Sequence, residues 1–202
     1  MRCAPVVART SSPAATRALA AAVAGLLEPG DLLLLVGELG TGKTTFVQGL
    51  AQGLGVTGPV TSPTFTLVRA YGTAGTKAGT GAAAGTGPRG AAAVRTLFHA
   101  DLFRLERLSD VVDLGLAEMV EDEAVAVVEW GDVAGPVFGP DTLTVCLAAD
   151  GTEDERTLRL ETGGTWAARA AALAERLRPW TVGAGGDGAP PEAGAGAGGR
   201  SS

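Results

Sequence analysis

The sequence predicts a three-layer α/β domain, in which helices cover both faces of a mixed, mainly parallel sheet. Two continuous apolar runs, 32–36 and 124–128, are typical of parallel strands that are buried on both faces. Helical periodicity precedes the first run and returns directly after it, so helices and strands alternate at the start of the chain. Alternating segments later in the chain predict additional antiparallel pairs. The other expected strands are 64–71, 96–101, 143–147 and 157–160, and the other expected helices are 109–114, 116–121 and 166–177.

The first helix is expected to begin at Ser12 and Pro13, which are typical of an N-cap and a first helical position. The sequence Glu28-Pro29-Gly30 should end it. Its apolar stretch 19–27 resembles the core of a signal peptide, but the caps favour an amphipathic helix within the domain. No run approaches the roughly 18 apolar residues of a membrane span, so no membrane partner is expected.

A phosphate-binding loop is predicted between the first apolar strand and the helix at 44–54. The segment Gly37-Glu38-Leu39-Gly40-Thr41-Gly42-Lys43-Thr44 fits G-x-x-x-x-G-K-[ST]. Its glycines allow a tight turn that directs backbone N–H groups at phosphate oxygens, and the helix N-terminus favours an anion. The predicted ATP-binding residues are Gly37, Glu38, Leu39, Gly40, Thr41, Gly42, Lys43, Thr44 and Thr45. The motif and its position predict a P-loop NTPase-like fold.

Two candidate acidic residues stand at the ends of predicted strands. Magnesium at the phosphates needs an acidic partner at the carboxyl end of a neighbouring buried strand, where Glu129 stands, so Thr44 and Glu129 are the expected metal ligands. The alternative is a strand-end glutamate in solvent. Asp101 could orient the attacking water or hold the metal shell, or form a structural salt bridge with Arg104. We expect Lys43, Asp101 and Glu129 to act in the reaction.

Other polar and aromatic residues have two readings each. His99, the only histidine, shares a strand face with Asp101, and a supporting hydrogen bond to that aspartate is favoured over a direct role. Ser62 and Thr64 lie where nucleotide switches place a hydroxyl that senses the terminal phosphate, or they cap a turn at Pro63. Trp130 lies beside the nucleotide or a partner, or it closes the core.

Composition limits the other classes of function. The net charge of −6 argues against direct, tight RNA binding by a broad basic surface. Two cysteines without metal-ligand spacing suggest neither a disulfide framework nor a zinc site, and a cytoplasmic location fits. The expected domain covers residues 1–180, interrupted by a flexible Gly/Ala-rich insertion at 72–95, and a disordered Gly/Ala/Pro-rich tail follows at 181–202.

Four separated motifs resemble the TsaE (YjeE) family, and the likeness extends over roughly residues 10–178. They are 37–45, 61–68, 98–105 and 128–130. The resemblance implies a small ATPase that uses Mg²⁺ and works with the TsaD and TsaB proteins, which install the threonylcarbamoyl group on adenosine 37 of certain tRNAs. It also implies that Glu129 replaces the usual second acidic motif and that Asp101 and Trp130 belong to the site. The insertion at 72–95, and Gly131-Asp132 where a proline and an acid commonly follow the tryptophan, depart from the family pattern.

Hydrolysis of ATP coupled to a partner's conformational cycle is the function that the sequence favours, with tRNA reached only through the complex. ATP is favoured over GTP because the guanine-reading Asn-Lys-x-Asp element cannot exist in a chain without asparagine. No arginine finger is evident, so hydrolysis should be slow without the partners. The alternatives are a small-molecule kinase, whose lid would be 72–95, and an adaptor that binds ATP without turning it over.

Overall fold

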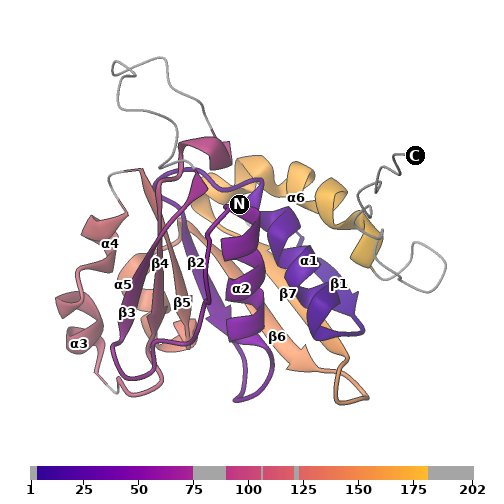
Figure 1. Ribbon diagram of the computed structural model, residues 1–202, viewed down its shortest axis with the longest axis horizontal. Coiled ribbons are helices and arrows are strands. Elements are labelled where there is room, and N and C mark those ends of the chain that lie inside the picture. The colour runs from indigo at the N-terminus through magenta and orange to yellow at the C-terminus, as the bar shows by residue number, and fades with distance from the viewer. Residues whose placement is uncertain (1–3, 75–89, 106, 121–122, 182–202) are drawn as a thin grey trace, which may run out of the picture.

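Seven strands form a single sheet in a computed structural model that describes residues 4–74, 90–105, 107–120 and 123–181. Their order across the sheet is β1-β7-β6-β2-β5-β4-β3 (Figure 1). The four neighbours β6, β2, β5 and β4 are parallel, whereas β3, β7 and β1 pair antiparallel at the two sides. The strands are β1 Val6–Thr10, β2 Leu32–Val36, β3 Val68–Gly72, β4 Thr96–Asp101, β5 Ala124–Glu129, β6 Thr142–Ala149 and β7 Arg156–Thr162. The predicted mixed sheet is therefore confirmed.

Helices cover both faces of this sheet. α1, α2 and α6 pack in one layer, and α3, α4 and α5 pack on the opposite face. The α-helices are α1 Pro13–Ala24, α2 Lys43–Gly53, α3 Leu108–Asp113, α4 Leu116–Met119, α5 Gly131–Phe138 and α6 Ala170–Leu177. Short 3₁₀ helices are η2 Gly90–Ala93, η3 Gly164–Arg169 and η4 Arg178–Trp180. This arrangement confirms the three-layer α/β fold.

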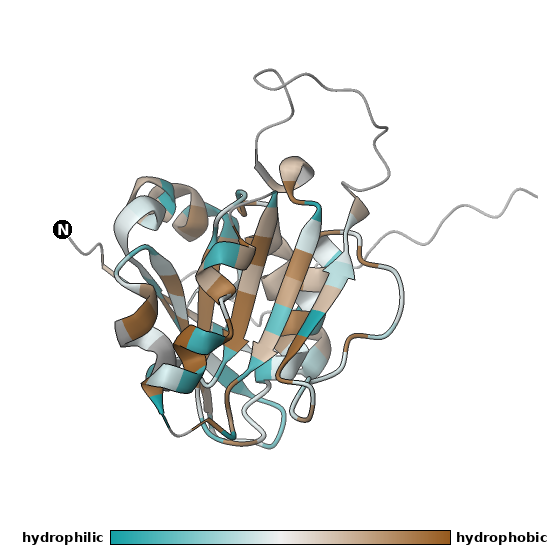
Figure 2. Cartoon of the chain, turned by 90° about the vertical axis from the view of Figure 1, so that its left-hand side faces the viewer, coloured by the Kyte–Doolittle hydropathy of each residue, from teal (hydrophilic) through white to brown (hydrophobic). Residues whose placement is uncertain are grey.

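The continuous apolar strands are explained by burial on both sides. In β2, Leu33 and Leu35 belong to the core under α1, α2 and α6, while Leu32 and Leu34 belong to the core under α3, α4 and α5. All six residues of β5 are buried. Figure 2 shows hydrophobic colour along the middle strands. Because neither face meets water, the alternation of a half-exposed strand is absent.

Several predicted boundaries differ from the structure. The strand expected at 64–71 begins only at Val68, because the N–H groups of Thr66 and Leu67 bond to the Pro63 carbonyl and Leu67 adopts a φ of 61°. Alternation cannot reveal such a turn. The helix expected at 166–177 begins as the 3₁₀ helix η3, and the first helix ends at Ala24, before the predicted stop.

One strand and one α-helix were not predicted. The short edge strand β1 pairs with β7, and α5 follows directly after β5. α5 begins at Gly131, where an added Cβ would lie only 2.7 Å from the Cβ of Leu34. The departure from the family pattern at Gly131 therefore coincides with a close approach of helix and sheet.

Most of the expected insertion and tail lie outside the described residues. Residues 75–89 and 182–202 are not described, whereas Gly72 ends β3 and Gly90–Ala93 form η2. Thr181, the first residue of the expected tail, forms an isolated antiparallel bridge with Ala8. The domain boundaries remain predictions. Within the described ranges, no helix has the length and apolar character needed to cross a bilayer.

Candidate nucleotide site

The predicted phosphate loop connects β2 to α2 and turns at three glycines. Gly37, Gly40 and Gly42 have φ values of 153°, 80° and 96°. At Gly37 an added Cβ would also collide with the carbonyl oxygen of Leu147, so a side chain there is excluded by both backbone and space. Gly42 is the N-cap of α2 and provides no side-chain cap. The first N–H groups of α2 are thus available to a ligand at the helix N-terminus.

Lys43 lies inside the loop, only 5% exposed. Its Nζ donates to the carbonyl oxygens of Gly37 (2.7 Å) and Glu38 (2.8 Å) and lies 4.0 Å from the centroid of the Trp130 ring. Burial lowers the pKa of Lys43, against the opposing attraction of Glu129, Asp101 and Asp132. The ammonium group is therefore held by neutral groups, which an anion could replace.

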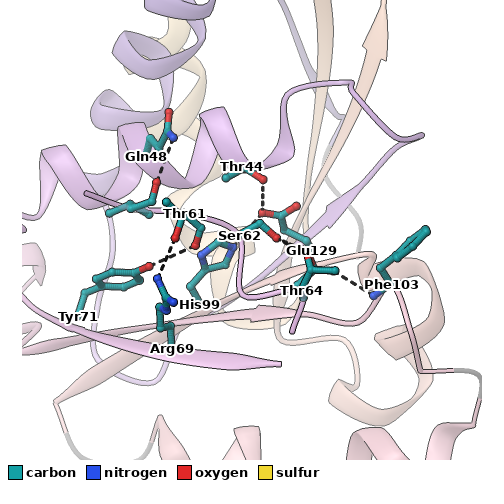
Figure 3. Close-up of polar contacts among 12 residues, drawn as sticks. Thr44, Gln48, Thr61, Ser62, Thr64, Arg69, Tyr71, His99, Phe103 and Glu129 are labelled. Atoms are coloured by element: carbon teal, nitrogen blue, oxygen red, sulfur yellow. Dashed lines mark hydrogen bonds and ion pairs between the residues drawn. The ribbon is translucent and has the colours of Figure 1, made fainter. Parts of the chain in front are cut away.

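Glu129 is the last residue of β5 and turns its carboxylate toward the N-terminus of α2. Its Oε1 accepts from Thr44 Oγ1 at 2.8 Å and lies 2.9 Å from His99 Nε2 (Figure 3). A carboxylate can only accept, so Nε2 carries the hydrogen, and within the described residues Nδ1 is buried without a partner. Glu129 is 3% exposed, which excludes the reading of a glutamate in solvent.

Asp101 accepts three hydrogen bonds. Its Oδ2 accepts from Ser62 Oγ at 2.6 Å and Thr64 Oγ1 at 2.7 Å, and its Oδ1 accepts from the Phe103 N–H at 3.0 Å. Burial raises the pKa of Asp101, but these hydrogen bonds and the nearby His99 outweigh it and lower the pKa overall. Asp101 is thus a carboxylate at neutral pH.

The structure has neither a salt bridge between Asp101 and Arg104 nor a hydrogen bond between His99 and Asp101. Arg104 lies over the Phe65 ring, 4.4 Å from its centroid, and forms no ion pair with Asp101. His99 bonds to Glu129 rather than to Asp101. The His99 contact depends on the neighbouring strand, because β4 pairs with β5 in a register that sets Asp101 beside Glu129.

The segment 60–64 is held by α2 and by β3 at the two residues that precede Ser62. Gln48 of α2 donates to the Val60 carbonyl at 3.1 Å. From β3, Arg69 donates to Thr61 Oγ1 at 2.8 Å and Tyr71 to the Thr61 carbonyl at 3.3 Å (Figure 3). The two hydroxyls are consequently fixed next to Asp101, where a turn cap alone would not require them.

These groups surround one open cavity of about 420 Å³. Its lining residues are Leu39, Gly40, Gly42, Lys43, Thr44, Thr45, Ser62, Thr64, Asp101, Phe103, Glu129 and Trp130. Of the predicted site residues only Gly37, Glu38 and Thr41 are outside this lining, and all three belong to the loop itself. Trp130 also packs against the core and tilts against Phe103, with ring centroids 5.0 Å apart, and its role beside a nucleotide or a partner stays a prediction.

The donor set fits a magnesium ion that is bound together with a triphosphate. Glu129 Oε2 has no partner among the described residues, although Oε1 has two. A hydroxyl and a carboxylate are oxygen ligands, which Mg²⁺ prefers. No group of three His, Cys, Asp or Glu residues in the described part could hold a metal by itself. Phosphate oxygens and water would therefore complete the shell, as is usual for Mg²⁺.

Sequence reasoning missed two residues of this region. Phe103 follows Asp101 and lines the cavity, but an exposed aromatic residue after a strand has no signature of its own. Arg156 contacts the outer side of the phosphate loop from β7, through hydrogen bonds to the carbonyl oxygens of Thr41 and Gly40. Only the antiparallel pairing of β6 and β7 brings it there.

Known proteins resemble this chain in sequence and in structure. The sequence model of the family described as "Threonylcarbamoyl adenosine biosynthesis protein TsaE" matches residues 10–158. A relative from Bacillus subtilis, named tRNA threonylcarbamoyladenosine biosynthesis protein TsaE, is 36% identical over 74% of this chain and 81% of its own length. One of the same name from Treponema pallidum is 37% identical over 65% of this chain and 84% of its own.

A solved structure agrees with these matches. The crystal structure of Bacillus subtilis YdiB superposes with a TM-score of 0.63 at 30% sequence identity, covering 88% of this chain and 96% of that one. The matched region includes the phosphate loop, the segment 60–64 and the ends of β4 and β5. The chain belongs to the TsaE family, whose members have a P-loop-type fold and are named for tRNA threonylcarbamoyladenosine biosynthesis.

Proposed function

We propose that this chain binds and hydrolyses ATP with Mg²⁺ in the cavity at the phosphate loop, and so supports threonylcarbamoyl transfer to adenosine 37 of tRNA by a TsaB–TsaD complex. The observation that carries the proposal is the meeting of Thr44 Oγ1 and Glu129 Oε1 at 2.8 Å, beside Lys43 and across 85 residues of sequence. A loop that bound no nucleotide would have no need of a buried carboxylate there.

Lys43 is suited to hold the outer phosphates. Its two carbonyl partners are weaker acceptors than phosphate oxygens, so the ammonium group can exchange them for the ligand. Its lowered pKa reflects an environment that lacks enough negative charge, and a triphosphate supplies it. Thr44 and Glu129 would hold Mg²⁺, which neutralises charge that develops on the phosphates.

The cluster of Asp101, Ser62 and Thr64 is suited to orient an attacking water or to sense the terminal phosphate. It is not suited to abstract a proton. The lowered pKa of Asp101 makes it a poor general base but a permanent acceptor. It can hold an attacking water or release the Ser62 and Thr64 hydroxyls toward a terminal phosphate. A change in these bonds would then differ between ATP and ADP, which is what a nucleotide switch requires.

Two features support dependence on partners. No arginine is among the described residues that line the cavity, so none of them can act as an arginine finger that stabilises charge on the phosphates. Hydrolysis should therefore be slow without the partners. Leu39 and Phe103, which line the cavity, are 80% and 52% exposed, and Phe65, the neighbour of Thr64, is 85% exposed. Exposed aromatic and aliphatic side chains around a cavity are typical of a surface that a protein partner covers. We assign that partner to the TsaB–TsaD complex by the family relationship.

The test is reconstituted tRNA modification over many turnovers, with phosphate release measured in parallel. Lys43→Ala and Glu129→Ala should both lose sustained modification, and Glu175→Ala, an exposed carboxylate on α6, should behave as the unaltered chain. If phosphate release from the unaltered chain stays at the background level both with and without TsaB and TsaD, the proposal of hydrolysis is refuted. Stoichiometric phosphorylation of a nucleoside or sugar would favour the kinase alternative instead.

A further inference from the structure

A single arginine connects the phosphate loop to a hairpin that sequence motifs do not include. Arg156 begins β7, directly after the turn that joins it to β6. Its Nε donates to the Thr41 carbonyl at 2.9 Å and its Nη2 to the Gly40 carbonyl at 3.2 Å. On the hairpin side, Nη1 donates to the carbonyls of Glu153 (2.6 Å) and Glu155 (2.8 Å). The half-buried guanidinium group thus joins two backbone segments more than 100 residues apart.

The two loop carbonyls determine where the loop's N–H groups point. In a trans peptide the C=O and N–H bonds are antiparallel. The Thr41 carbonyl shares a peptide with the Gly42 N–H, and the Gly40 carbonyl shares one with the Thr41 N–H. When Arg156 holds both carbonyls outside the loop, those N–H groups are turned toward the other side. Gly40 and Gly42 both line the cavity, and Gly42 also lines a small hollow beside Arg156.

The loop has little of its own to maintain this orientation. Gly40 and Gly42 have no Cβ, and both occupy positive φ values. Thr41 bonds within the loop only to the Glu38 carbonyl, through its N–H at 3.3 Å and its Oγ1 at 2.9 Å. A glycine-rich loop samples many peptide orientations unless an outside group selects one. The rigid fork of a guanidinium group selects two at once, which a lysine could not do.

We propose that Arg156 is a positioning residue for nucleotide binding, which presets the Gly40–Gly42 peptides so that their N–H groups face the phosphates. The inference rests on the proposed function, because it needs a phosphate ligand at the loop. It adds a residue outside the phosphate-loop motif to the determinants of affinity. Since the preset peptides would serve the ground state and the transition state alike, Arg156 should act on KM more than on kcat.

The test compares Arg156→Ala and Arg156→Lys with Arg9→Ala. Arg9 lines the same surface hollow as Arg156 but pairs with Asp150 at 3.1 Å, so its removal deletes the same charge without touching the loop. Calorimetric titration with Mg·ATP and Mg·ADP should show a roughly 10-fold to 100-fold loss of affinity for Arg156→Ala. Arg156→Lys should recover only part of it, and Arg9→Ala should match the unaltered chain.

Two further readouts separate positioning from a general loss of folding. In partner-stimulated hydrolysis, Arg156→Ala should raise KM with kcat nearly unchanged, whereas a smaller folded fraction would lower kcat at constant KM. Without nucleotide, hydrogen exchange of the amides in 37–43 should quicken in Arg156→Ala and not in Arg9→Ala. Should Arg156→Ala fail to fold, Arg156→Lys still has to show the raised KM.

Unchanged affinity in Arg156→Ala, an equal loss in Arg9→Ala, or a fall in kcat alone would overturn the inference. If the unaltered chain gives no heat with Mg·ATP, the proposed function fails by itself. The hydrogen-exchange comparison then still decides whether Arg156 holds the loop.

Discussion

Two buried carboxylates at opposite edges of the sheet have very different surroundings. Asp31 precedes β2 at its amino end, and Glu129 ends the parallel neighbour β5 at its carboxyl end. Both are at most 5% exposed. Asp31 accepts two bonds of 2.6 Å from Arg169 and one of 2.7 Å from the Glu28 N–H. Within the described residues, Glu129 has no lysine or arginine in an ion pair and only one of its oxygens is occupied.

The difference shows how to separate a structural charge from a functional one. The Asp31 carboxylate is neutralised by a bidentate guanidinium that also stacks on Trp166, so nothing further can bind to it. The Glu129 carboxylate is buried without a lysine or arginine in direct contact, although the Lys43 ammonium lies near enough to be attracted by it, and Glu129 lines the cavity. Such a group is prepared for a cation that comes from outside. The predictions below test whether this contrast holds.

The largest effect is expected when the ion pair between Asp31 and Arg169 is broken. Asp31→Asn leaves Arg169 buried without its counter-charge, which should lower the free energy of unfolding by roughly 3–5 kcal/mol. Urea unfolding measures it. The folded fraction should bind Mg·ATP as the unaltered chain does, because the pair lies at the edge of the sheet opposite the cavity.

A matched double variant checks the cause. Removing both partners in Asp31→Asn with Arg169→Met should cost less than the sum of the single changes, since no lone charge remains. A loss below about 1 kcal/mol for Asp31→Asn alone would mean that the pair is not needed for stability.

The same carboxylate-to-amide change at Glu129 should lower activity strongly and leave stability nearly unchanged. Glu129→Gln keeps an acceptor for Thr44 and His99 but removes the charge, so the unfolding free energy of the nucleotide-free protein should change by less than about 1 kcal/mol. Partner-stimulated ATP hydrolysis should fall roughly 100-fold, because the metal ligand is lost. Destabilisation as large as that of Asp31→Asn would erase the distinction between the two groups.

The sequence predicted that Lys43, Thr44 and Glu129 would lie together. Lys43 and Thr44 follow one buried strand, and Glu129 ends another. Parallel strands end at the same edge of a sheet, so placing these residues together needed no knowledge of side-chain packing. Asp101 was expected in the site from the strand face that it shares with His99 and from the family resemblance, and the structure has it in the same cavity.

What the sequence could not predict depends on neighbours that are distant in the chain. Strand periodicity set His99 and Asp101 on one face, but the register with β5 determined that His99 meets Glu129. Arg156 reaches the phosphate loop only because β7 folds back along β6. The bidentate partner of Asp31 comes from η3, about 140 residues away. No local pattern encodes these pairings.

A smaller effect is expected from the histidine that holds Glu129. His99→Leu keeps an apolar side chain of similar bulk but removes the hydrogen bond to Oε1, so the carboxylate loses one of its two donors. Hydrolysis should fall roughly tenfold, and the Mg²⁺ concentration for half-maximal activity should rise. His99→Gln, which retains a donor, should recover much of the loss. Equal losses in both variants would assign His99 to packing alone.

The smallest effect is expected from Asp101 in acid, and its sign follows from its hydrogen bonds. Its pKa in the folded protein is below the ordinary value of about 3.9, so between the two values the unfolded chain binds the additional proton. The stabilisation is therefore complete above that ordinary value and disappears as the pH falls through the folded pKa. The group differs here from Lys43, whose lowered pKa makes its charged form cost stability at neutral pH.

Asp101→Asn isolates this contribution. At neutral pH the variant should be less stable than the unaltered chain by about 1 kcal/mol, since the Ser62 and Thr64 hydroxyls lose a charged acceptor next to an open cavity. As the pH is lowered and the Asp101 carboxyl of the unaltered chain becomes protonated, the unfolding free energies of the variant and the unaltered chain should converge. If the two plots of unfolding free energy against pH stay parallel in acid, Asp101 is not the ionised centre of this hydroxyl cluster. Its role would then resemble neither that of Glu129 nor that of Asp31.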